Sequence, residues 1–260
     1  MEVDYYKKLF QTIGNIIELI EKDDIPKYLL FLENAFPYMD NYNYHKGMNG
    51  IIQELTGLLR TKNIGTDSDR ALLLDFQATL ETKPEKAIKL EKDALAQIET
   101  ITADNARLVS NLHANLGGLY RMNGHPDLAR EHMEKSISLL DQFNLLHIND
   151  SIPQIANYAM FLTEQQEPER GISELQKLSG IIKEYHSDDC LDYAKVQETL
   201  GTIYLMTANL PQAKTHFKRA FKIYEKIWAD EPEMIEAKYQ EIQELYPQIG
   251  FCIGKNLSGL

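Results

Sequence analysis

Residues 199–220 read TLGTIYLMTANLPQAKTHFKRA, and this stretch sets the structural pattern of the chain. Small and large apolar residues recur in it three or four positions apart, on both sides of a turn that ends at Pro211. They are Leu200, Gly201, Tyr204, Ala213, Phe217 and Ala220. Such spacing is typical of amphipathic helices, and a proline in the first turn of a helix leaves no needed hydrogen bond unmade. The stretch therefore predicts two helices joined by a short turn.

The same pattern returns every 42 residues. Three segments align without gaps at this period: Asn115-Leu-Gly-Gly-Leu-Tyr120, Asn157-Tyr-Ala-Met-Phe-Leu162 and Thr199-Leu-Gly-Thr-Ile-Tyr204. The residues that follow them keep the same step, and Leu73-Leu-Asp-Phe-Gln-Ala78 extends the series by one period upstream. Self-similarity at a fixed period is the signature of repeat proteins. The sequence thus predicts four units, at residues 68–109, 110–151, 152–193 and 194–235.

The repeated pattern resembles the tetratricopeptide repeat, in the longer variant found in kinesin light chains and in many bacterial proteins. The Trp that is usual at the fourth position of this repeat is absent, and Ala71, His113, Ile155 and Gln197 stand there. Small residues recur in columns 8, 20 and 27 of the unit, which lets neighbouring helices approach closely. The resemblance implies an all-α fold: a right-handed superhelical solenoid of antiparallel helix pairs, with capping helices at both ends.

The ends of the chain are predicted to cap a single α-solenoid that spans residues 1–260. Residues 1–67 are expected to hold an N-terminal helix and a degenerate helix pair, and residues 236–260 a capping helix and a tail. Helices are expected there at residues 3–22, 26–36, 44–60 and 232–246. The terminal units of a solenoid need a polar outer face, because no further unit covers them.

Composition and charge exclude several classes of protein. The 260 residues include 27 Lys and Arg against 39 Asp and Glu, a net charge of −12 that disfavours binding to nucleic acid. No apolar run approaches the ~18 residues that span a bilayer, and the first residues do not resemble a secretory signal. Two cysteines, Cys190 and Cys252, cannot build a disulfide framework. We therefore expect a cytoplasmic protein that binds neither nucleic acid nor membranes.

The sequence offers no catalytic or metal-binding constellation, so we expect neither enzymatic activity nor a cofactor nor a metal. His125 and His132 lie seven residues apart on one predicted helix face, where a metal site and simple surface exposure are the alternatives. The loops His147–Asp150 and His186–Asp189 also resemble ligand clusters. Helix capping by their Asp and Asn side chains explains them as well.

A partner-binding surface is predicted on the first helix of each unit. Positions 4, 7, 8 and 11 form its apolar stripe, so positions 2, 5, 6, 9, 12 and 13 point away from the core at ~100° per residue. The candidate residues on this face are Asn111, Asn115, Gly118, Arg121, Met122, Asn157, Met160, Lys195, Glu198, Thr199 and Thr202. In the repeats that this chain resembles, these columns line a concave groove that binds an extended peptide.

Asn115 and Asn157 occupy the same column of successive units, and Thr199 is next in line. The resemblance implies that such an Asn holds the backbone of an extended peptide, since an amide both donates and accepts hydrogen bonds. Alternatively, each Asn bonds within its own protein and the methionines pack against the adjacent helix. Only Arg121 and Lys195 are cationic among the candidates, so the sequence does not predict a clamp for an acidic terminus.

The sequence therefore predicts a non-catalytic scaffold that binds a peptide or a partner protein in its groove. The alternative is an intracellular peptide-pheromone sensor of the bacterial long-repeat type, which would act through its N-terminal helices. Three further possibilities stay open: a homo-oligomer formed through the solenoid ends, an accessory protein of an enzyme, and a fragment of a larger signalling protein.

Overall fold

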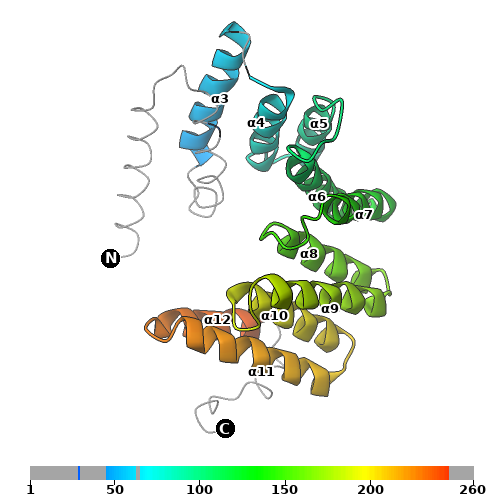
Figure 1. The fold of residues 1–260 in the computed structure, drawn as a ribbon, viewed down its shortest axis with the longest axis vertical. Helices are drawn as coiled ribbons and strands as arrows, with labels where there is room; N and C mark the ends of the chain where they lie inside the picture. The colour runs from blue at the N-terminus through cyan, green and yellow to red at the C-terminus, as the bar shows by residue number, and fades with distance from the viewer. Residues whose placement is uncertain (1–28, 30–44, 63–64, 246–260) are drawn as a thin grey trace. The chain divides into compact units, whose positions relative to one another are not determined.

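The computed structural model describes residue 29 and residues 45–62 and 65–245, and helices are the regular elements of this part of the chain (Figure 1). They are α3 (His45–Lys62), α4 (Asp67–Thr79), α5 (Pro84–Leu95), α6 (Ala106–Met122), α7 (Pro126–Gln142), α8 (Ser151–Glu164), α9 (Pro168–Tyr185), α10 (Leu191–Met206), α11 (Leu210–Ile227) and α12 (Pro232–Leu245). The predicted all-α fold is confirmed. The helices predicted at residues 3–22 and 26–36 and the C-terminal tail lie outside the described residues.

The second helices of the units keep the predicted period. Helices α5, α7, α9 and α11 begin at Pro84, Pro126, Pro168 and Leu210, each 42 residues after the one before. A proline stands in the first turn of each, where its missing N–H would have no helical partner. Helices α3 and α12 coincide with the helices predicted at residues 44–60 and 232–246.

The turn inside a unit is also repeated in detail. Gly124, Gln166 and Ala208, again 42 residues apart, all have a left-handed backbone, with φ of 74°, 64° and 57°. After each, an N–H reaches back across the turn to the last part of the first helix, as in the bond of 2.7 Å from the Asn209 N–H to the Tyr204 carbonyl. This is the Schellman ending of a helix, which satisfies the last carbonyls and reverses the chain. The turn thus reverses the chain between α8 and α9 and between α10 and α11, which pack as pairs.

The described helices fall into two compact units, one up to His125 and one from Pro126 onward. In the first, α4 packs against α5 and α5 against α6, around a core that includes Ala71, Ala94 and Leu112. In the second, α8 pairs with α9, α10 pairs with α11, and α8 lies beside α10. Leu175 and Phe217 are buried at the centre of this second core. A single solenoid over residues 1–260 stays a prediction.

Gly171 marks the closest approach within a helix pair, between α9 and α8. A Cβ atom at Gly171 would lie 2.6 Å from the carbonyl oxygen of Ala159, and a backbone oxygen in a packed pair cannot move away cheaply. We expect Gly171→Ala to lower the free energy of unfolding by about 1–3 kcal/mol. Gly180 lies on the same helix with nothing within 4 Å of its own Cβ position, which makes it the matched control.

Gly180→Ala should instead stabilise the protein by about 0.5–1 kcal/mol, because alanine favours the helix. Thermal and urea unfolding followed by circular dichroism measure both variants. If Gly171→Ala proved as stable as Gly180→Ala, the close packing of α8 on α9 would be refuted.

Candidate functional site

The predicted partner-binding residues all lie on first helices of the repeat. Helix α6 carries Asn111, Asn115, Gly118, Arg121 and Met122; α8 carries Asn157 and Met160; α10 carries Lys195, Glu198, Thr199 and Thr202. All of them are exposed or half-buried, and Met122 is the most open, with 82% of its surface exposed. Helices α8 and α10 pack side by side in the second compact unit, and whether their candidate residues form one binding face stays a prediction. The α6 residues form a separate set in the first unit.

The predicted outward face is wrong at several positions. In the first repeat unit Leu73, Phe76 and Leu80, at positions 6, 9 and 13, are at most 9% exposed. Position 12 is predicted to point outward, yet Thr163 on α8 and Leu205 on α10 are each only 7% exposed. The first helix of a repeat packs against its own second helix and also against a neighbouring repeat. Its buried apolar stripe is therefore wider than that of a helix with one packing partner. The Thr163 hydroxyl satisfies itself locally by donating to the carbonyl of Ala159 at 2.9 Å. The accessible face is therefore narrower than the helical wheel predicts.

On α10 the candidate polar groups are mostly engaged within the protein. The hydroxyls of Thr199 and Thr202 donate to the carbonyls of Lys195 and Glu198, one turn earlier, at 3.0 and 3.1 Å. The Lys195 amine is exposed and lies 3.8 Å from the carboxylate of Asp192. Lys195 thus presents a cation to the face, while the threonines present mainly methyl groups and a second acceptor.

Glu198 on α10 contacts two further helices, α11 and α12. One carboxylate oxygen accepts the hydroxyl of Tyr224 on α11 at 2.6 Å, and the other lies 2.9 Å from the amine of Lys238 on α12. Burial alone would lower the pKa of Lys238, but the attraction of Glu198 and of Glu241 raises it above its ordinary value. Glu198 therefore holds α12 against α10 and α11.

The two asparagines of the predicted clamp have different surroundings. Asn157 on α8 is exposed, and its amide is offered to solvent. Asn115 on α6 instead donates its amide hydrogen to the carboxylate of Asp75 on α4 at 2.8 Å. Asn115 is thus committed to a polar cluster inside the first unit, and Asn157 is the better placed of the two to receive a ligand.

That cluster contains a buried carboxyl group that sequence reasoning missed. Glu91 on α5 is 1% exposed, and its Oε2 atom has no hydrogen-bond partner within the described part of the chain. Burial, repulsion by the Asp75 carboxylate and a hydrogen bond with Asp75 raise the pKa of Glu91 to about 10, against a smaller opposing effect of Asn115. Glu91 is therefore a neutral acid at physiological pH, in a hydrogen bond with Asp75.

The repeat register contains the signal for this cluster. Asp75 stands in the column of Gly117, Ala159 and Gly201, and Glu91 in the column of Met133, Leu175 and Phe217. The other units thus place a small residue and a large apolar one where the first unit places two acids. A comparison of the charge at each column of the four repeats would have identified Asp75 and Glu91.

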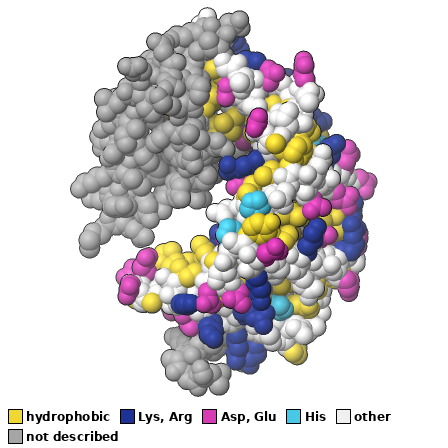
Figure 2. Space-filling view, in the orientation of Figure 1, with side chains coloured by type: hydrophobic (Ala, Val, Ile, Leu, Met, Phe, Trp, Pro, Cys, Tyr) yellow, Lys and Arg dark blue, Asp and Glu magenta, His cyan; other side chains and the backbone are white. Residues whose placement is uncertain are grey.

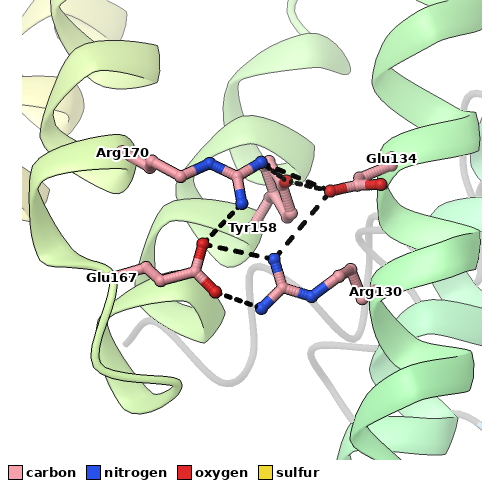
Figure 3. A network of polar contacts seen from close by, with 5 residues as sticks. All are labelled: Arg130, Glu134, Tyr158, Glu167 and Arg170. Carbon is pink, nitrogen blue, oxygen red and sulfur yellow. Dashed lines mark hydrogen bonds and ion pairs between the residues drawn. The ribbon is translucent and has the colours of Figure 1, made fainter.

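A second polar network joins α7, α8 and the start of α9 (Figure 3). Glu167, just before α9, receives hydrogen bonds from Arg130 on α7 at 2.6 Å and from Arg170 on α9 at 2.5 Å. Glu134 on α7 accepts the hydroxyl of Tyr158 on α8 at 2.8 Å and lies 3.4 Å from Arg170. The two arginines hold the pKa of Glu167 below its ordinary value. With two cations and two anions paired, the network fixes α7, α8 and α9 and leaves no charge for a ligand.

The two loops that resembled ligand clusters have structural roles. The His186 ring bonds the carbonyl of His147 at 2.9 Å, and the His147 ring stacks on Tyr185. Helix α10 is capped by the thiol of Cys190, which accepts the N–H of Tyr193, rather than by the aspartates before it. Within the described residues, no three His, Cys, Asp or Glu side chains gather as metal ligands would.

Comparisons with known proteins agree with this architecture. Residues 151–226 match the tetratricopeptide repeat family. The chain is similar in fold to BtubC (BKLC) from P. vanneervenii, with 17% identity and a TM-score of 0.52 over 78% of this chain and 74% of that one. It is also similar to a putative kinesin light chain from Podosopora anserina with nearly identical TPR-like repeats, with 15% identity and a TM-score of 0.55 over 75% of this chain and 96% of that one.

At these identities the structural likeness shows the fold alone. A search of curated protein sequences finds no match. No described helix is long and apolar enough to cross a membrane. The tetratricopeptide repeat is generally a scaffold for protein–protein interaction, in which stacked helix pairs present extended surfaces. Residues 151–226 therefore match the tetratricopeptide repeat family, and the described part of the chain has the helical-repeat fold of such proteins.

Proposed function

We propose that the chain is a cytoplasmic, non-catalytic module that binds an extended segment of a partner protein across the face formed by α8 and α10. The observation that carries this proposal is the exposed amide of Asn157 on α8 and the exposed amine of Lys195 on α10, two helices that pack together. An amide pairs with a peptide backbone of any sequence, and the amine can receive a carboxylate. Met160 and Met206 add adaptable apolar contact to the same face.

The polar contacts described above narrow the set of residues that can meet a partner, because some candidates are already bonded within the protein. Glu198 is engaged with Tyr224 and Lys238, so it positions α10 rather than meeting the ligand. Asn115 is engaged with Asp75 in the first compact unit, so it is not among the proposed contacts. The proposed contacts are thus unequal, with Asn157 and Lys195 foremost.

The test uses capture of partners from the native lysate, identification by mass spectrometry, and then calorimetry with the identified segment. We expect Asn157→Ala with Lys195→Ala to weaken binding at least ~10-fold, about 1.4 kcal/mol, because both exposed polar contacts are lost. The matched control is Gln176→Ala with Lys177→Ala, which truncates an exposed amide and an exposed amine on α9. Equal losses in the two double variants, or none in the first, would place the binding surface elsewhere.

The alternative of a peptide-pheromone sensor depends on an effector role for the N-terminal helices. Residues 1–28 and 30–44 lie outside the described residues, and none of the contacts in the described helices favours this role over partner binding. Capture of a short secreted peptide in the experiment above, rather than of a protein segment, would be the result that selects it.

A further inference from the structure

A row of lysines follows the outward face of α11, on the second helix of the last clear unit. Lys214, Lys218 and Lys222 are spaced four residues apart, and Arg219 lies beside them. Figure 2 shows Lys and Arg side chains gathered over this helix. Lys214, Lys222 and Arg219 are exposed and Lys218 is half-buried. In a protein with a net charge of −12, such a concentration of positive charge is local and unexpected.

The lysines of this row form no close ion pair within the described part of the chain. The two acids that line the adjoining pocket have partners already: Asp189 bonds the amine of Lys226, and Asp188 lies 3.6 Å from the amine of Lys183. Bonding to Lys226, with a smaller attraction from Lys222, holds the pKa of Asp189 below its ordinary value, so this ion pair persists at physiological pH. Like charges four residues apart on a helix repel one another. An anion placed along the row would relieve that repulsion.

A pocket of about 390 Å³ opens beside the row, between the end of α9, the start of α10 and α11. Lys183 closes one side of it, and Lys218, Arg219 and Lys222 close the other. The Lys183 amine lies 5.2 Å from the centre of the Tyr193 ring, which fixes this cation at the rim. The surface therefore combines a line of cations with a recess that can accept a side chain.

We propose that the outward face of α11, along Lys214, Lys218 and Lys222, binds an extended acidic segment of a partner protein. Residues four apart on a helix are ~6 Å apart along its axis, and alternate residues of an extended strand are ~6.6 Å apart. Acidic side chains at every second position of the segment therefore meet successive lysines. The proposal is independent of the face of α8 and α10, because it uses a different helix.

Other anions fit this surface less well. Nucleic acid strands bind where bases stack on aromatic rings, but Tyr193, the aromatic residue of the pocket, is only 3% exposed. Residues 246–260 of the chain itself contain no Asp or Glu and cannot supply the acidic side chains. A protein segment with spaced carboxylates matches the charges, the spacing and the recess together.

The experiment measures fluorescence anisotropy of a labelled peptide in which Glu alternates with Ser over about eight residues, titrated with the full chain. We expect saturable binding that weakens as salt is raised, and at least a tenfold loss of affinity in Lys218→Glu with Lys222→Glu. The control variant, Lys89→Glu with Lys135→Glu, makes the same change of net charge at exposed lysines of α5 and α7. The control should keep the affinity within twofold, and Asn157→Ala should also keep it.

Several results would overturn the proposal. They are an absence of peptide binding, an equal loss in the control variant, and tighter binding of a single strand of DNA of the same length than of the peptide. Light scattering adds another: a dimer of the wild-type chain that dissociates in the Lys218→Glu, Lys222→Glu variant would make a second copy the occupant. Because all substituted side chains are exposed or half-buried, circular dichroism should show unchanged helix content in both variants.

Discussion

Glu91→Gln is expected to stabilise the first unit at neutral and alkaline pH and to remove most of its pH dependence. Gln keeps the shape of the protonated carboxyl group and can donate its amide hydrogen to Asp75, but it has no proton to lose. The wild-type side chain, 1% exposed beside Asp75, must either keep its proton or leave a second charge in the core. The substitution should therefore make permanent the neutral, hydrogen-bonded side chain that the wild type has only while Glu91 is protonated.

The direction of the pH effect follows from the raised pKa. Glu91 has a pKa of about 10 in the folded chain against an ordinary value of 4.5, so between these values the folded state holds one proton more than the unfolded state. Its contribution to stability is complete below about pH 4.5 and is lost as the pH rises toward 10. The slope is ~1.4 kcal/mol per pH unit, so on the order of 4 kcal/mol separates pH 5 from pH 8.

Thermal unfolding of the wild type and of Glu91→Gln at about pH 5, 6.5 and 8 measures this difference, with hydrogen exchange in α5 reporting on the first unit alone. Asp93→Asn is the matched control, since it removes an exposed acid from the same helix. The control should follow the wild-type pH dependence. A Glu91→Gln variant that is less stable than the wild type at pH 8, or equally dependent on pH, would contradict a neutral Glu91.

The helix pairs could be predicted from the sequence because their determinants are local. Each second helix begins 42 residues after the one before and has a proline in its first turn, a local signal for the start of a helix. Gly124 marks the turn in one unit, but Gln166 and Ala208 adopt the same left-handed backbone without that signal. Their turn is imposed by the Schellman hydrogen bonds of the preceding helix rather than by residue type.

The candidate face could be predicted only in part, because side-chain partners come from other helices. The helical wheel correctly places Asn157 and Lys195 at the surface. It cannot show that Glu198 meets Tyr224 and Lys238, which lie on later helices, or that α8 buries Thr163. The apolar period of a helix indicates which residues face one core. A helix in a repeat protein has more than one neighbour, so the period alone misses residues that a second neighbour buries.

Phe217→Ala is expected to destabilise the second unit by about 3–5 kcal/mol, the largest loss from a single truncation that we predict. Phe217 is 1% exposed, and its ring lies so close to Gly201 that a Cβ atom there would be 2.9 Å from the ring carbons. The glycine leaves the space that the ring fills, and neither residue fits its place without the other. Tyr185→Ala, which truncates an aromatic ring that is 51% exposed, should cost less than about 1 kcal/mol.

The preceding 42-residue repeat shows how Gly201 and Phe217 can be replaced together. There the same columns hold Ala159 and Leu175, both fully buried. Gly201→Ala alone should clash with the ring and Phe217→Leu alone should leave a cavity, each lowering the free energy of unfolding by about 1–3 kcal/mol. The double variant rebuilds the Ala–Leu pair and should recover at least ~1 kcal/mol of the summed loss, a coupling that urea unfolding resolves. Additive losses would mean that the residues of these two columns do not pack against each other. The view that Asp75 and Glu91 replace such a packed pair in the first repeat would then fail as well.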